Sequence, residues 1–203
     1  RLTIRKASVS RTDNNVYLLT CTASGAQLLI DAADDSERLG ALIDEGTGRL
    51  DAIATTHQHW DHTRALADLV AWTSAPTYAG SLDAGALPVD TTHLLDHGDT
   101  VRFGDITLDV VGLRGHTPGG IALVYRDDTP GGIPHLFVGD SLFPGGIGNT
   151  SMAGQSFEQL YADVVARLFD VYADDTWVYP GHGADTTLGR ERPHLAEWHA
   201  RGW

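Results

Sequence analysis

The segment 57–62, His-Gln-His-Trp-Asp-His, constrains this chain more than any other stretch. It places three imidazoles and one carboxylate within six positions, directly after the apolar, strand-like run 50–56. Neutral imidazole is a good ligand for borderline divalent metals, and carboxylate suits the harder ones. If the backbone is extended at 57–59, His57 and His59 lie on one side and can converge on one ion. Asp61 and His62 would then face a second ion nearby, so the string predicts a metal centre rather than a solvated polar loop.

Three further candidate ligands follow apolar runs and lie in glycine-rich turns. His116 lies in Gly-His-Thr-Pro-Gly-Gly, Asp140 in Gly-Asp-Ser-Leu-Phe, and His182 in Pro-Gly-His-Gly. Glycine beside a ligand lets the backbone turn sharply and approach an ion closely. Any one of these turns could be an ordinary strand end with an incidental polar residue. Three of them downstream of the first motif predict one shared site.

This ordered set of motifs resembles the metallo-β-lactamase-fold hydrolases, and within them the glyoxalase II-like branch, the hydroxyacylglutathione hydrolases. The resemblance extends over nearly the whole chain, from the opening strands to the segment after His182. It implies an α+β fold, the four-layer αβ/βα sandwich, in which two mixed β-sheets are flanked by helices and the site lies where the strands end. The residue pattern alone predicts only mixed α and β structure.

The resemblance also implies two adjacent metal ions. It divides the seven candidate ligands into a first set, a second set and a bridge: His57, His59 and His116; Asp61, His62 and His182; and Asp140. Five imidazoles and two carboxylates are too many for one tetrahedral zinc, but they suit two ions that share an oxygen ligand and a water. Such a water loses its proton near neutral pH and becomes a nucleophile. Zn²⁺ fits the imidazole-rich set best, and Fe or Mn also suits a mixed histidine and carboxylate site.

The leading functional hypothesis is metal-dependent hydrolysis of a thioester, or a similar acyl bond, in a small-molecule substrate. Asp140 and Asp61 are the candidate catalytic residues, and Asp61 has a possible second role as a general base. Trp60, Phe143 and Asn149 are candidate substrate-binding residues, with a buried anchor or an ordinary loop as the alternative.

Larger glyoxalase II enzymes carry a C-terminal helical extension that helps to bind glutathione. Only residues 183–203 follow His182, so we expect a single domain over 1–203 that lacks this extension. Either the chain resembles the short bacterial glyoxalase II-like proteins, or its substrate is not a glutathione conjugate.

Other activities stay open on the same fold. The runner-up is a persulfide dioxygenase, because such relatives share much of the ligand set but use a single iron at the first site. A lactonase and a non-catalytic metal-binding protein are further alternatives. A β-lactamase is disfavoured because its best-known branch has Cys where this chain has Asp140. A nuclease is disfavoured by the acidic charge and by the lack of an inserted nucleic-acid-binding domain.

The composition of the chain limits which ligands and surroundings are expected. The formal net charge is −13 and the only lysine is Lys6, which disfavours nucleic acid as a ligand. No apolar run is long enough to cross a bilayer. The single cysteine, Cys21, excludes an internal disulfide and is expected to be a small buried residue in a cytoplasmic protein. The sequence starts at Arg1, so an export signal removed ahead of it stays an open alternative, as does the oligomeric state.

Periodicity and turn residues predict the elements. Strands are expected near 2–9, 16–22, 26–31, 50–55, 76–79, 92–95, 101–103, 106–111, 120–125, 133–138 and 176–179. Helices are expected at 36–45, with Ser36 as the cap and Gly46 after the end, at 63–72, at 156–169 behind a capping box of Ser156 and Gln159, and at 187–192, stopping at Pro193. The remaining histidines are expected on the surface or bracing the site: His93, His97, His135, His194 and His199.

Overall fold

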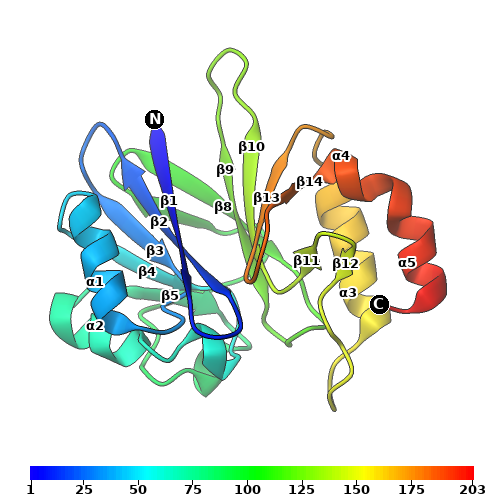
Figure 1. Cartoon of the computed structure of the whole chain (residues 1–203), viewed down its shortest axis with the longest axis horizontal. Helices are drawn as coiled ribbons and strands as arrows, with labels where there is room; N and C mark the ends of the chain where they lie inside the picture. The colour runs from blue at the N-terminus through cyan, green and yellow to red at the C-terminus, as the bar shows by residue number, and fades with distance from the viewer.

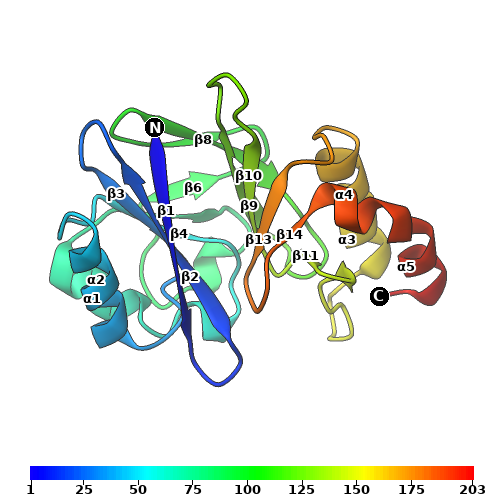
Figure 2. The same ribbon diagram turned by 45° about the horizontal axis from the view of Figure 1, so that its top comes forward.

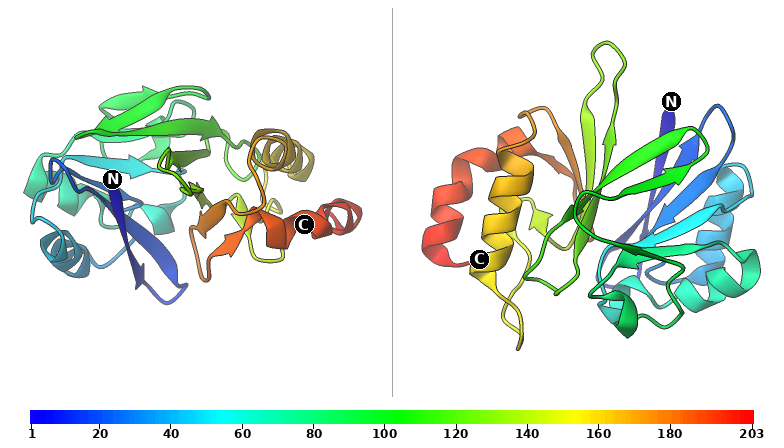
Figure 3. Two further views of the ribbon diagram at one scale, coloured as in Figure 1. Left: turned by 90° about the horizontal axis from the view of Figure 1, so that it is seen from above. Right: turned by 180° about the vertical axis from the view of Figure 1, so that it is seen from behind.

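The computed structural model describes all residues from 1 to 203 and contains two six-stranded β-sheets, with helices on both outer sides (Figures 1 and 3). The first sheet has the order β1-β2-β3-β4-β5-β6. Its strands are Leu2–Val9, Asn14–Cys21, Gln27–Ile30, Ala52–Thr55, Thr77–Gly80 and His93–Leu95. The first three strands pair antiparallel and the last four pair parallel, so the sheet is mixed.

The second sheet has the order β14-β13-β10-β9-β8-β7. In chain order its strands are β7 (Thr100–Phe103), β8 (Ile106–Gly112), β9 (Ile121–Arg126), β10 (Pro134–Gly139), β13 (Trp177–Pro180) and β14 (Thr186–Thr187). Only β10 and β13 pair parallel. A separate small hairpin, β11 (Leu142–Phe143) and β12 (Gly146–Ile147), follows the end of β10.

Helices cover the outer faces of both sheets (Figures 1 and 2). Helices α1 (Ser36–Glu45) and α2 (Leu66–Thr73) pack on the first sheet, whereas α3 (Phe157–Val164), α4 (Leu188–Glu191) and α5 (Leu195–Arg201) accompany the second. Short helical turns complete the chain: η1 (Trp60–His62), η2 (Ala84–Ala86), the π-type η3 (Val165–Phe169) and η4 (Arg192–His194). None of these helices is both long enough and apolar enough to span a bilayer.

Three apolar layers hold the two sheets and their helices together. Because successive side chains of a strand point to opposite faces, the neighbours Leu18 and Leu19 of β2 enter different layers. Leu19 packs between the sheets with Phe137, and Leu18 packs toward the α1 and α2 side with Leu39. The third layer lies between the second sheet and its helices and includes Trp198. This arrangement confirms the predicted four-layer sandwich.

The ends of several helices differ from the prediction. Asp35, not Ser36, caps α1, because its carboxylate accepts from the backbone N–H of Arg38 at 3.1 Å. The helix predicted to stop at Pro193 continues through η4 into α5. Proline is tolerated in a first helical turn, where its missing N–H has no partner to lose. The cap of α3 is confirmed, since Ser156 Oγ accepts from the backbone N–H of Gln159.

Candidate metal centre

The seven predicted ligand side chains meet at one edge of the sandwich. They form two neighbouring groups, in each of which the potential ligand atoms lie within 4.8 Å of one another. The first histidine group is His57, His59 and His116, and the second group is Asp61, His62 and His182. Asp140 lies between the two groups. Its Oδ2 is 3.7 Å from His116 Nε2 and 3.3 Å from His182 Nε2, and its Oδ1 is 3.3 Å from His62 Nε2.

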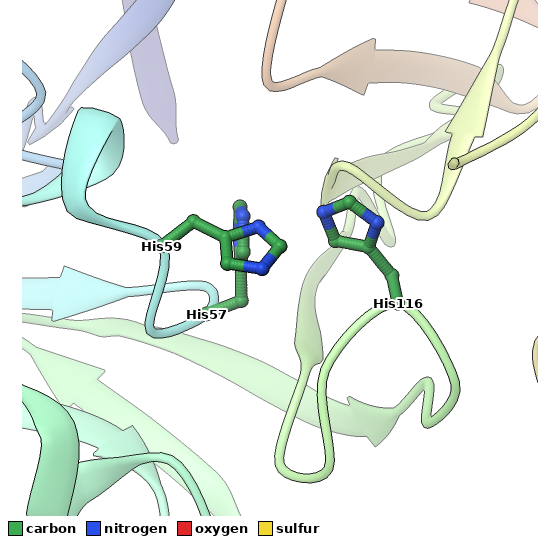
Figure 4. Close-up of side chains that lie close together, drawn as sticks. All are labelled: His57, His59 and His116. Atoms are coloured by element: carbon green, nitrogen blue, oxygen red, sulfur yellow. The ribbon is translucent and has the colours of Figure 1, made fainter. Parts of the chain in front are cut away.

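The loop after β4 supplies both groups. His59 has extended backbone angles (φ −63°, ψ 137°), and the turn η1 that follows carries Asp61 and His62 toward the second group. The loop after β8 brings His116 toward the first pair, and Figure 4 shows its ring facing those of His57 and His59. The ring centroids of His59 and His116 are 4.5 Å apart.

Four of the five histidines are fixed through Nδ1, which leaves Nε2 directed at the centre. His62 Nδ1 donates to Asp31 Oδ2 at 3.0 Å, and His116 Nδ1 donates to the backbone carbonyl of Asn149 at 2.6 Å. The other two pairs are His57 Nδ1 with Thr56 Oγ1 at 3.0 Å and His182 Nδ1 with the Thr12 carbonyl at 2.8 Å. Such contacts set the tautomer and the ring orientation of metal-binding histidines.

Three buried polar atoms at the centre have no hydrogen-bond partner: His57 Nε2, His116 Nε2 and Asp140 Oδ1. Leaving a buried polar atom unpaired costs about 1–3 kcal/mol. Imidazole nitrogen and carboxylate oxygen are donors that divalent cations accept, so a bound ion would satisfy all three atoms. The donor set is therefore compatible with a dinuclear metal site.

The two groups differ in their protonation. Burial holds the pKa of His57 well below its usual value, and burial with the nearby His116 lowers the pKa of His59. Both rings are therefore neutral near neutral pH, with lone pairs free for an ion.

In the second group, burial disfavours the charged form of His62. The carboxylates of Asp140 and Asp31 outweigh this effect and raise the pKa of His62 to about 10. Asp140 and Asp61 likewise raise the pKa of His182 to about 10. Protons therefore occupy these rings when no metal does.

Glycines let the ligand loops approach one another, as the sequence predicts. A Cβ on Gly181 would lie 2.1 Å from Asp140 Oδ1, and one on Gly148 would lie 1.7 Å from the Asp140 carbonyl oxygen. Neither glycine has a positive φ, so the requirement at both positions is steric.

Sequence reasoning missed three buried residues that support the centre: Asp31, Asp83 and Asn14. Asp31 accepts hydrogen bonds from Thr56 and from His62. It directly follows the buried strand β3, just as the predicted ligands follow apolar strands, so the sequence did contain a signal for it.

Asp83 is tied to both ligand loops of the first histidine group. It accepts from the backbone N–H groups of Gln58, at 2.9 Å, and Gly119, at 2.6 Å. No local sequence pattern distinguishes Asp83 from an ordinary turn residue.

The predicted substrate-binding residues lie in different surroundings. Trp60 is 68% exposed and its ring is covered by the guanidinium of Arg64, whose Cζ lies 3.8 Å from the ring centroid. The ring of Phe143 is 6.4 Å from that of His182. The backbone carbonyl of Asn149 accepts from His116 Nδ1, while the Asn149 side chain accepts from the backbone N–H of Ser151. The five other histidines lie outside both ligand groups, and Cys21 is buried.

Comparison with known proteins identifies the family. The family model described as the metallo-beta-lactamase superfamily matches residues 9–188, and the chain belongs to this superfamily. A hydroxyacylglutathione hydrolase of Thermosynechococcus vestitus is 39% identical over 138 residues, which are 68% of this chain and 52% of that protein. The chain thus spans about half the length of this curated relative.

Solved structures are similar over almost the whole chain. ETHE1 from Myxococcus xanthus has a TM-score of 0.85 and 27% identity, with 98% of this chain and 85% of that chain covered. A structure of TTHA1623 "in a di-iron-bound form" has a TM-score of 0.78 and 32% identity, with 93% of this chain and 96% of that chain covered.

Proposed function

We propose that this protein is a metal-dependent hydrolase that cleaves a thioester, or a related acyl bond, of a small molecule with the help of two divalent ions. The observation that carries the proposal is the position of Asp140 between two groups of potential ligands, with one buried oxygen unpaired. The names of relatives support the thioester, and a relative solved with two irons supports a dinuclear site.

Different residues of the chain would bind the two ions of such a centre. The first histidine group would hold one ion, the second group the other, and Asp140 both. Ions bound there would activate a water for attack on a carbonyl carbon and would polarise that carbonyl. Hydrogen bonding with His182 holds the pKa of the Asp61 carboxyl well below its usual range. A carboxylate with so low a pKa is ionised and available as a ligand but is a weak base, which favours Asp61 as a ligand over a general base.

Zinc is the proposed ion, because imidazole-rich sets suit it, with iron or manganese as alternatives. A cavity of about 630 Å³ lies beside the loop whose Asn149 carbonyl fixes His116, and Ile147, Phe157 and Trp203 line it. This volume is within the usual range for small-molecule sites, about 300–1,000 Å³. We assign this cavity and Phe143 to the substrate side of the centre.

The test is an activity panel of thioesters, lactones and persulfides, run on metal-replete protein with elemental analysis. We expect the unaltered protein to hydrolyse a thioester and to bind two ions per chain. We expect Asp140→Ala to lose both the hydrolysis and the two-ion stoichiometry. Asp128→Ala removes an exposed carboxylate of a distant loop and is the matched control. If the metal-replete protein hydrolyses none of the panel, the hydrolase proposal is wrong.

A persulfide dioxygenase is the second candidate. The first histidine group is complete by itself and could hold a single iron without the second group. One iron per chain, with oxygen uptake in the presence of a persulfide, would favour this activity over hydrolysis.

A further inference from the structure

The hairpin of β1 and β2 forms one side of the centre, and Asn14, the first residue of β2, lies next to its connecting turn. In Figure 1 the tip of this hairpin lies beside the turn that leads out of β13. An isolated bridge pairs Asn14 with His182, the backbone N–H of Asn15 donates to the Gly181 carbonyl at 2.8 Å, and that of Gly183 donates to the Asp13 carbonyl at 3.1 Å. Backbone hydrogen bonds to this hairpin therefore fix the position of His182, one of the predicted ligands.

The side-chain amide of Asn14 is fully buried and can lie only one way round. Its Oδ1 accepts from the hydroxyls of Ser10, at 2.6 Å, and Thr12, at 2.7 Å. Hydroxyl groups can donate or accept, but the Asp61 carboxylate can only accept, so the donor end of the amide, Nδ2, must face the centre.

Nδ2 of Asn14 donates to Asp61 Oδ2 at 3.1 Å and lies 3.4 Å from His182 Nε2. Both of these neighbours belong to the second group, and no residue of the first histidine group is hydrogen-bonded to this amide. The same hairpin also fixes the ring of His182, because the Thr12 carbonyl accepts from its Nδ1. The hairpin therefore contacts two of the three side chains of one group only.

We infer that Asn14 is a positioning residue that sets the affinity of the second metal position, and through it the balance between a one-metal and a two-metal centre. This inference rests on the metal centre proposed above. The amide holds Asp61 in place, the backbone of the same hairpin holds His182, and Asn14 is not itself a ligand. Removal of such outer contacts weakens metal binding by about 10–100-fold.

The experiment is a stepwise Zn²⁺ titration of the full chain against a competing chelator, which separates the affinities of the two ions. Asn14→Leu removes the amide at nearly constant size. We expect one of the two binding steps to lose about 10–100-fold in affinity while the other step is unchanged. The variant Gln27→Met removes another fully buried amide of the same sheet, far from the centre, and should change neither step.

A purely structural role of Asn14 would weaken both zinc steps together, and that result, or no change in either step, would overturn the inference. If Asn14→Leu does not fold, Ser10→Ala combined with Thr12→Val tests the same point, because these residues orient the amide from the hairpin tip. Fewer than two ions bound by the unaltered protein would instead refute the dinuclear centre itself.

Discussion

Substitution of Gly181 by alanine should disable the metal centre with little damage elsewhere. The added Cβ would lie 2.1 Å from Asp140 Oδ1 and 2.8 Å from His62 Cε1, whereas real Cβ atoms essentially never approach closer than 3.0 Å. The carboxylate oxygen must therefore move by about 0.9 Å. Metal–ligand distances tolerate only about 0.2 Å, so the bridging geometry would be lost. Overpacking of this kind also costs about 1–3 kcal/mol of folding free energy.

The assay is zinc stoichiometry by titration, together with denaturant unfolding of metal-free Gly181→Ala. We expect loss of at least one ion and a decrease of about 1–3 kcal/mol in the free energy of unfolding. Gly40→Ala is the matched control, because nothing lies within 4 Å of its added Cβ. Alanine in place of a helical glycine should raise stability by about 0.5–1 kcal/mol. Two zinc ions bound to Gly181→Ala with unchanged affinity would refute the steric reasoning.

Two further predictions concern protons and loop anchoring. The pKa values of His62 and His182 are raised to about 10 in the metal-free fold, against about 6.5 when unfolded, so their stabilising effect is complete below pH 6.5 and is lost as the pH rises toward 10. Denaturant unfolding of chelator-treated protein should show this decline in the free energy of unfolding as the pH rises. Zinc-saturated protein should not show it, because zinc binds the neutral rings better at higher pH. The same pH dependence of stability with and without zinc would contradict this prediction. Asp83→Ala leaves the N–H groups of Gln58 and Gly119 without their acceptor. At about 1–3 kcal/mol for each N–H, denaturant unfolding should show a loss of about 2–6 kcal/mol, and zinc titration should show weaker binding of one ion. Unchanged stability in this variant would mean that water replaces the carboxylate.

The meeting of the seven candidate ligands at one edge could be predicted from sequence, because each follows an apolar strand and lies in a turn. The strand ends bring residues from four different loops to one edge, so His57 and His182 meet despite their distance along the chain. The strand positions were predictable for the same reason, since buried strands are continuous apolar runs bounded by glycine, proline and aspartate.

Asn14 and Asp83 could not be predicted as supporting residues, because their partners are distant in sequence. Asn14 contacts Asp61 and His182 only after the hairpin folds against β13, and Asp83 joins two loops through backbone N–H groups. Backbone donors leave no trace in the sequence. The prediction missed the helical structure that continues past Pro193. Proline interrupts the interior of a helix, but it fits the first turn of one.

The most direct measurement is anomalous diffraction from a crystal of the zinc-loaded protein. Two metal peaks should appear, one bound by His57, His59 and His116, the other bound by the second group, with one carboxylate oxygen of Asp140 reaching both. A single peak, or two peaks of which only one touches Asp140, would contradict the proposed centre.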